Sequence, residues 1–410
     1  MRTLLVAERY PWPQNSGSRL RLGGILRGLS RCGPVDLFSV LPATRTDVLP
    51  PPDDSGLDRM GWTTFDTRPP AGLARLATVL RWDTPFELAR PDGGAALRSL
   101  TRFARGPYDL VWYFRIRAFA LVGGVLAAPT VLDLDDLEDH KIAAQVAVPG
   151  GDADRPGDRA RRSLSRALAV EEARRWRRLQ AGAASRVDAT VVCSELDAGR
   201  ARRAGVARVE VVPNGYRLVD DPVGQTAVHD PPTVLFAGTL QYPPNADGAR
   251  FLVGEVGPAL RRLVPDARIR LVGRTTPALA ALDDPPRVRV VGQVPEMADE
   301  LASTDVVVVP LRFGSGTRLK ILEAFAQRVP VVSTTLGAEG LGAEDDVHLL
   351  VADSAGGLAE ACARLLEDAG LRHRLVDRAH ALFRERFSDD VVSGEIAALA
   401  RRVAGSSGVG

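Results

Sequence analysis

Short runs of aliphatic and β-branched residues alternate with longer amphipathic stretches along most of this chain. Alternation of this kind is typical of a parallel β-sheet whose strands are joined by crossover helices. It therefore predicts an α/β fold. In the first half of the chain, the runs expected to form strands are residues 3–7, 35–40, 110–113, 130–134 and 189–193.

The same alternation starts again after residues 216–232, a polar, proline-containing stretch without clear periodicity. A chain of 410 residues is also too long for one ordinary hydrophobic core. We therefore predict two similar domains joined by a linker. In the second domain, strands are expected at residues 233–237, 268–272, 288–291, 306–309, 329–333 and 348–351. The predicted division is an N-terminal domain at 1–215, a linker at 216–232, a C-terminal domain at 233–386, a last helix at 387–404 and a flexible tail at 405–410.

Three segments between and after these strands are expected to be helical. Residues 158–186 are rich in arginine, and their apolar residues recur near helical spacing, which predicts a long, mainly structural helix with a solvated basic face. Residues 20–29 are expected to lie in the first helix. Arg19 and Arg21 could reach a cleft between the domains, but a position on the helix surface is the commoner role of such arginines. Ser388 is a candidate N-cap for the last helix.

Charge and cysteine content exclude several classes of function. The 53 basic and 51 acidic residues leave a formal charge of +2, which gives no reason to expect nucleic acid as a partner. The three cysteines are far apart, which indicates neither a disulfide framework nor a zinc site. No run approaches the ~20 apolar residues that span a bilayer, and residues 1–9 read as a strand instead of a signal peptide. These features favour the cytoplasm.

The most informative segment comes after the strand at residues 306–309. A glycine-containing turn comes next, and a helix is expected to begin near Thr317. Free backbone N–H groups and the positive end of the helix dipole would then lie at the carboxyl edge of a parallel sheet, where α/β proteins bind anions.

Helical spacing places Gly316, Lys320, Glu323 and Gln327 on one face of that helix. In one interpretation, Lys320 neutralises a phosphate and Glu323 accepts hydrogen bonds from a ribose diol. In the other, the two residues form a surface ion pair that contributes a few tenths of a kcal/mol. The spacing alone does not decide between these interpretations.

The order of several motifs resembles the family 4 retaining glycosyltransferases with the GT-B fold, in which two Rossmann-like domains face each other across a cleft and a C-terminal helix returns toward the first domain. The resemblance covers nearly the whole chain. It implies a nucleotide-diphosphate sugar as co-substrate, no other cofactor, no metal, and transfer with retention at the anomeric carbon. The segments that carry the resemblance are residues 10–19, 211–215, 235–240, 271–274, 291–295, 314–324, 330–334 and 337–341.

Two departures from the family pattern concern the donor site. Members commonly have two glutamates eight positions apart at the glycine-rich turn, and here Ser315 stands in the first position while Glu323 keeps the second. Many members also carry an arginine and a lysine after the first strand of the second domain, where this chain has Thr239 and Asn245. The diphosphate needs fixed positive charge in the transition state. We predict that Arg318 and Lys320 supply it, and some bacterial members resemble this chain in both features.

The resemblance assigns further residues to the donor. In the first domain, Gly17 is expected to let the backbone approach the phosphates. The nucleobase is expected near Arg274 and Val294. The complete predicted donor-binding set is Gly17, Gly238, Thr239, Asn245, Arg274, Val294, Gly314, Ser315, Gly316, Thr317 and Glu323.

An acidic run, residues 133–141, follows a predicted strand of the first domain. Its Asp-x-Asp pattern occurs in manganese-dependent glycosyltransferases of a different, single-domain architecture, which the rest of this chain does not match. We therefore predict no metal site. Asp136 and His140, with Lys141, either contact the transferred sugar or the acceptor or are solvated charges at a helix start. The prediction takes Asp136 and His140 as catalytic residues beside Lys320 and Arg318.

Two other functions fit the same architecture. A nucleotide-sugar epimerase would turn over donor without acceptor, and a noncatalytic sugar-nucleotide-binding subunit would explain the loss of the first glutamate. A glycosyltransferase is the stronger prediction, with a glycan, a lipid-linked glycan or a natural product as acceptor. Peripheral contact with a membrane is not favoured. The sequence does not identify the sugar, the nucleobase, the acceptor or the oligomeric state.

Overall fold

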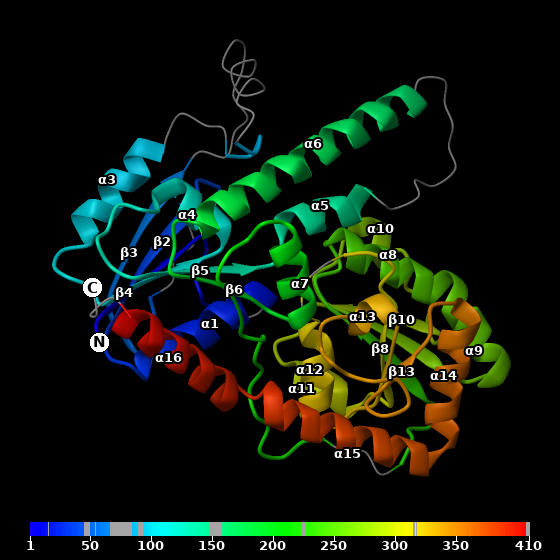
Figure 1. Cartoon of the computed structure of the whole chain (residues 1–410). Helices are drawn as coiled ribbons and strands as arrows, with labels where there is room; N and C mark the ends of the chain where they lie inside the picture. Colours follow the sequence, from blue (N-terminus) through cyan, green and yellow to red (C-terminus); the bar gives the residue numbers. More distant parts are fainter. Residues whose placement is uncertain are drawn as a thin grey trace. The chain divides into compact units, whose positions relative to one another are not determined.

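The computed structural model contains two compact units (Figure 1). The first unit comprises Met1–Asn214 and Val392–Gly410, and the second comprises Gly215–Val391. The chain therefore passes between the units twice. The structure describes residues 1–14, 16–44, 50–53, 55–65, 84–88, 93–146, 158–223, 227–314, 316 and 318–406.

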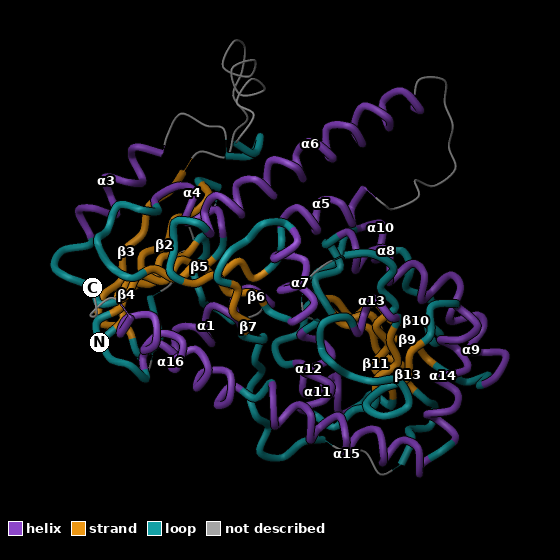
Figure 2. Tube along the Cα trace, viewed as in Figure 1, coloured by secondary structure: helices purple, strands orange, loops and turns teal. Residues whose placement is uncertain are grey.

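The first unit is built on a seven-stranded parallel sheet with the strand order β3-β2-β1-β4-β5-β6-β7. Its central strands are buried on both faces, because helices cover each side of the sheet (Figure 2). The strands are β1 (Thr3–Ala7), β2 (Val35–Pro42), β3 (Leu57–Phe65), β4 (Leu110–Phe114), β5 (Thr130–Asp135), β6 (Ala189–Val192) and β7 (Val209–Val211).

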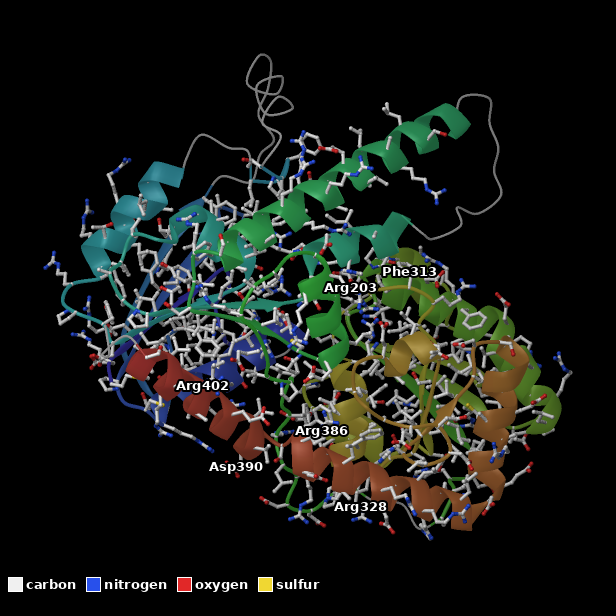
Figure 3. The ribbon with its side chains drawn as sticks, viewed as in Figure 1. Arg203, Phe313, Arg328, Arg386, Asp390 and Arg402 are labelled. Atoms are coloured by element: carbon white, nitrogen blue, oxygen red, sulfur yellow. The ribbon has the colours of Figure 1, made fainter. Side chains whose placement is uncertain are left out.

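Two apolar clusters fill the two faces of this sheet. One cluster joins α1 and α16, and the other includes residues of α3, α4 and α6. At the surface, Arg402 of α16 pairs with Glu210 of β7 at 2.9 Å (Figure 3). None of the helices in the described part of the chain is both long and apolar enough to cross a bilayer. The helices are α1 (Gly17–Ser30), α3 (Gly93–Phe103), α4 (Ile116–Val122), α5 (Glu138–Val146), α6 (Asp158–Ala184), α7 (Glu195–Arg203) and α16 (Asp389–Ser406).

The second unit is built on a six-stranded parallel sheet with the strand order β10-β9-β8-β11-β12-β13. The strands are β8 (Thr233–Ala237), β9 (Arg268–Val272), β10 (Val288–Gly292), β11 (Val306–Val309), β12 (Val331–Ser333) and β13 (Leu350–Val351). The helices are α8 (Pro243–Phe251), a π-helical segment η1 (Leu252–Val256), α9 (Gly257–Leu263), α10 (Pro277–Ala280), α11 (Met297–Ala302), α12 (Leu319–Ala326), α13 (Thr335–Ala338), α14 (Ala355–Glu367) and α15 (Ala369–Arg386).

Each sheet reverses its strand order once, beside its own first strand. In the first unit the reversal lies between β1 and β4, and in the second it lies between β8 and β11. The connections that follow two such strands leave in opposite directions, so the carboxyl ends of the strands are left uncovered there. These two points are where ligands of doubly wound α/β domains bind.

The predicted α/β fold with two Rossmann-like domains is confirmed. Four strands have the predicted bounds, at residues 3–7, 233–237, 268–272 and 306–309. Strands β3 and β7 were not predicted, because their residues are mostly half-buried and mix apolar with charged side chains. Helix α12 begins at Leu319, two residues later than expected.

The C-terminal helix α16 belongs mostly to the first unit, as the predicted return toward the first domain requires. Its apolar residues join the same cluster as α1. Ser388 lies directly before α16, where its hydroxyl donates to the carbonyl oxygen of Arg384 at 3.0 Å. The 27-residue helix α6 spans almost the whole predicted arginine-rich segment.

Helices α1 and α16 approach each other closely at Gly28, and this contact makes a stability test. A Cβ atom on Gly28 would lie 2.6 Å from the Ile396 side chain and 3.0 Å from the carbonyl oxygen of Ser393. Gly28→Ala should destabilise the protein by about 1–2 kcal/mol, because overpacking outweighs the better helix propensity of alanine. Urea unfolding of the purified variant measures the change.

Gly182 provides the matched control, because it lies in α6 and a Cβ there would meet none of the described residues within 4 Å. Gly182→Ala should be neutral or stabilise by up to ~1 kcal/mol. Equal stability of the two variants would contradict the packing of α16 on α1.

Candidate functional site

In the second unit, the turn after β8 is shaped by a glycine that tolerates no side chain. Gly238 has a φ of +149°, a region that favours glycine. A Cβ atom there would lie 2.9 Å from Nζ of Lys320 and 3.0 Å from Nδ2 of Asn245. The bare backbone at Gly238 therefore lets a cation from α12 and an amide from α8 pack against the end of β8.

Lys320 is the central cation of this cluster. Its Nζ donates to Oδ1 of Asn245 at 2.9 Å and lies 4.2 Å from the ring centre of Phe236. Asn245 is itself oriented, because its Nδ2 donates to the carbonyl oxygen of Thr239 at 3.0 Å. Burial and the nearby Arg318 lower the pKa of Lys320 to about 7, against the opposing effect of Glu323. An anion placed here would restore the positive charge of Lys320.

The turn after β11 contains two glycines with positive φ values. Gly314 and Gly316 have φ values of +123° and +87°. A Cβ atom at Gly314 would come within 3.2 Å of Pro244 at the start of α8, so the turn after β11 packs against the first turn of α8. Arg318 is buried and directly precedes α12. Ser315 and Thr317 lie outside the described residues, and their roles stay predictions.

Glu323, one turn along α12 from Lys320, accepts a hydrogen bond that the sequence did not predict. The hydroxyl of Tyr216 donates to Oε1 of Glu323 at 2.6 Å. Burial raises the pKa of Glu323, and the bond from Tyr216 together with Arg217 and Lys320 opposes that rise. The interpretation of Lys320 and Glu323 as a surface ion pair therefore does not describe them. Both side chains are partly buried, and each has another hydrogen-bond partner.

Two further predicted residues lie at the same edge of the sheet. Arg274 follows β9, with an exposed side chain and a carbonyl oxygen that accepts from the backbone N–H of Gln241 at 3.1 Å. Val294 is half-buried and follows β10. Both residues thus come from the strands on the β8 side of the strand-order reversal, away from β11.

In the first unit, charged residues meet at the reversal between β1 and β4. Arg115, directly after β4, donates to Oε1 of Glu8 at 3.0 Å and to Oδ2 of Asp135 at 2.8 and 3.0 Å. All three side chains are buried. Arg115 and Asp135 also have positive φ values, +72° and +59°, which are strained for residues with a side chain. Strain held by buried ion pairs at a ligand-binding edge is typical of a functional site.

Arg21 is buried, and the expectation that it lies on the surface of the first helix is wrong. Its guanidinium donates to both carboxylate oxygens of Asp133, at 2.8 and 3.1 Å. It also donates to Oδ1 of Asn214 at 2.9 Å. Both oxygens of Asp133 are thus engaged by an arginine, and Asp135 is bonded to Arg115. Arg19, by contrast, is only half-buried, and its Nη1 donates to the carbonyl oxygen of Pro13 at 3.3 Å.

Asp136 is the acidic residue of this cluster that is most accessible. Its side chain is 19% exposed, and its Oδ2 lies 3.8 Å from Nη2 of Arg115. Burial and the repulsion of Asp135 raise the pKa of Asp136 to about 6. His140 is half-buried in α5, and Lys141 pairs with Glu138 at 3.6 Å. Gly17, at the start of α1, is exposed.

Three charged or polar residues of these clusters were not predicted from the sequence, namely Glu8, Arg115 and Tyr216. Glu8 and Arg115 each follow directly after a buried strand. A search for charged residues within two positions after each predicted strand would have found both. Tyr216 had no such signal, because it lay in the segment predicted as linker.

Comparisons with known proteins concern the second unit and the fold. Residues 231–368 match the family model described as glycosyl transferases group 1. This match lies within the second unit. No functionally curated protein sequence matches the chain significantly.

Solved structures extend the comparison to the whole chain. A sucrose-phosphate synthase from Thermosynechococcus elongatus has a TM-score of 0.68 at 17% identity, with 99% of this chain and 100% of that chain covered. Anabaena HepE in complex with UDP and glucose has a TM-score of 0.66 at 16% identity, covering 98% and 99%. The lipopolysaccharide outer core galactosyltransferase WaaB has a TM-score of 0.59 at 12% identity, covering 98% and 99%. The fold is that of the GT-B glycosyltransferases.

The raised pKa of Asp136 predicts how the stability of the protein changes with pH. The folded state binds the Asp136 proton more tightly than the unfolded state, so ionisation destabilises the protein as the pH rises from about 4 to about 6. Asp136→Asn removes this loss. The free energy of unfolding of the variant, relative to that of the unchanged protein, should increase by about 1 kcal/mol when the pH is raised from 5 to 7.5. Urea unfolding at both pH values measures this change.

Glu138 is the control with the opposite sign. Burial alone would raise its pKa, but Arg117 and Lys141 lower it to about 2. Its charged form therefore stabilises the fold above pH 4.5, and Glu138→Gln should lose stability at both pH values. A gain in both variants would show that the charge assignment of this cluster is wrong.

Proposed function

We propose that this protein is a metal-independent, retaining glycosyltransferase that moves a sugar from a nucleotide-diphosphate donor to an acceptor hydroxyl. The observation that supports it best is the position of Lys320. This partly buried cation, hydrogen-bonded to a neutral amide, lies at the strand-order reversal of a domain that matches the glycosyl transferases group 1 model. Diphosphate is the chemical group that such a site accommodates.

The diphosphate would bind where Lys320 meets the turn after β11. Lys320 would take up a proton as the anion binds, because its pKa is about 7 in the unliganded protein. Arg318 would add a second cation from the same turn. The backbone N–H group of Gly316 and the start of α12 would donate to phosphate oxygens.

The nucleoside would bind beside the same helix. Glu323 would accept hydrogen bonds from the ribose hydroxyls, one helical turn away from the cation. Arg274 and Val294, after β9 and β10, would contact the base. Anabaena HepE, which shares this fold, binds UDP-glucose, and this supports a nucleotide-sugar donor here.

The chemistry requires few protein groups. The bond between the anomeric carbon and the phosphate oxygen breaks, and a bond from the acceptor oxygen forms on the same face. The acceptor proton passes to the departing phosphate, so no dedicated base is needed. Lys320 would stabilise the growing charge on the leaving group. Asp136 and His140 are proposed to contact the acceptor, which would be a glycan, a lipid-linked glycan or a natural product.

Donor binding and product analysis test the proposal. Thermal shift with a panel of nucleotide sugars, starting with UDP-glucose, identifies the donor, since ligand at 100 times its Kd adds about 2.7 kcal/mol of stability. The anomeric configuration of the product is then read by NMR. An inverted product would refute retention. Conversion of the donor sugar without any acceptor would indicate an epimerase, and binding without turnover would indicate a noncatalytic subunit.

The role of Lys320 makes a kinetic prediction. Lys320→Met should lower the single-turnover rate at saturating donor by ~100- to 1,000-fold, with a smaller effect on affinity, because charge on the leaving diphosphate grows in the transition state. Lys320→Arg should restore the rate only in part, because the guanidinium is larger and its geometry is fixed. Calorimetric titration of UDP at pH 8 in two buffers should show proton uptake that Lys320→Met abolishes.

Arg364→Met is the matched control, because Arg364 is an exposed cation of the same unit whose Nη2 lies 3.3 Å from Oδ1 of Asp346. It should leave both rate and proton uptake unchanged. A Lys320→Met enzyme with the normal rate would remove Lys320 from the mechanism.

Metal independence makes a separate prediction. Treatment with a chelator should leave the rate of transfer unchanged, because Lys320 and Arg318 neutralise the diphosphate in place of a divalent cation. The rate is measured before and after addition of EDTA. Activity that disappears with EDTA and returns with manganese would contradict this prediction.

A further inference from the structure

Tyr216 is the partner of Glu323 that no motif indicated. Its hydroxyl donates to Oε1 of Glu323 at 2.6 Å, the usual distance for a hydrogen bond from a hydroxyl to a carboxylate. The residue is only 8% exposed. Burial and the carboxylate raise the pKa of the Tyr216 hydroxyl, so it remains a proton donor throughout the physiological range. The contact thus joins a permanent neutral donor to a partly buried carboxylate.

The backbone of Tyr216 is held on both sides by the chain that leaves α15. Its N–H donates to the carbonyl oxygen of Phe387 at 2.8 Å, and its carbonyl oxygen accepts from the N–H of Asp389 at 3.0 Å. Phe387 is buried, at 1% exposure. These bonds make a parallel bridge between Tyr216 and Ser388. The backbone of Tyr216 therefore cannot move away from α12 without breaking these two bonds.

The carboxylate of Glu323 retains free acceptor capacity. A carboxylate offers about four lone-pair directions, and Tyr216 uses one of them. Within the described part of the chain, the structure records no hydrogen bond to Oε2 of Glu323. The charged groups that affect Glu323 are Arg217 and Lys320, which favour its ionised form, and Glu296, which opposes it. Arg217 also forms an ion pair with Glu296, in which Nη2 lies 3.5 Å from Oε2.

We propose that Tyr216 is a positioning residue, which orients the Glu323 carboxylate so that its remaining acceptor sites meet the two ribose hydroxyls of the donor nucleotide. This inference rests on the proposed function. A neutral phenol suits the task, because it fixes the rotamer of Glu323 without cancelling its charge, as an arginine would. A carboxylate that is already oriented loses less conformational freedom when the nucleotide binds.

The test is Tyr216→Phe, which keeps the ring and removes only the hydroxyl. Its affinity for UDP, measured by calorimetry, should fall about 10-fold, the usual effect of one hydrogen bond to a charged group. The preference for UDP over its 2′-deoxy and 3′-deoxy analogues should shrink. The loss of UDP binding on acidification should begin at a higher pH, because the bond from Tyr216 is one of the interactions that oppose the raised pKa of Glu323.

Tyr108→Phe is the matched control. The Tyr108 hydroxyl donates to Oδ2 of Asp36 at 2.6 Å, the same distance and the same chemistry. Tyr108 precedes β4 and Asp36 lies at the beginning of β2, so this pair is in the first unit at the amino end of the strands. The control should lower the Tm of the unliganded protein by a similar amount but leave UDP affinity, ribose preference and pH dependence unchanged.

Glu323→Gln separates failure of this inference from failure of the proposed function. If Glu323→Gln binds UDP normally, the ribose assignment itself is wrong. If Glu323→Gln binds weakly while Tyr216→Phe matches the unchanged protein in affinity, ribose preference and pH profile, the positioning role is overturned. The double variant should bind no more weakly than Glu323→Gln alone. Additive losses would mean that Tyr216 acts on the nucleotide independently of Glu323.

Discussion

The candidate sites of this protein depend on one topological constraint, the reversal of strand order beside the first strand of each sheet. At that point two connections diverge, and the ends of the strands are left without a helix above them. Charged side chains of the first unit meet there through Glu8 and Arg115. In the second unit, Lys320 and Asn245 meet at the corresponding point. The same arrangement of backbone thus produces two charged clusters with different properties.

The two clusters differ in how their charges are compensated. In the first unit, Arg115 is bonded to two carboxylates and is held in a strained backbone conformation, so its charge is already compensated within the protein. In the second unit, Lys320 donates to a neutral amide, and burial lowers its pKa to about 7. A partly buried cation held by a neutral group is unfavourable in the empty protein and becomes favourable when an anion binds. This difference is why we place the phosphate-binding role in the second unit.

Local pattern predicted much of the fold and part of the site. Buried strands such as β8 and β11 are continuous apolar runs, and their length and turn residues are visible in the sequence. The glycine at 238 and the cation at 320 were also identified, and Nζ of Lys320 lies 2.9 Å from the position that a Cβ atom of Gly238 would take. The edge strand β3 escaped prediction because a half-buried strand has a weak apolar pattern. Arg21 was misplaced, since helical spacing cannot show that a guanidinium will meet a buried aspartate more than one hundred residues away.

The sequence by itself determined the class of fold, the order along the chain of the strands other than β3 and β7, and the identity of the groups that carry charge after β5 and β11. These follow from local spacing, because the period of the apolar residues sets the element and the turn residues set its ends. Only the tertiary structure decided the partners: Asn245 for Lys320, Tyr216 for Glu323 and Asp133 for Arg21. Those pairings join residues 75, 107 and 112 positions apart. Their burial, and hence their charge, is set by the packing of helices on the sheet, which no local window of sequence contains.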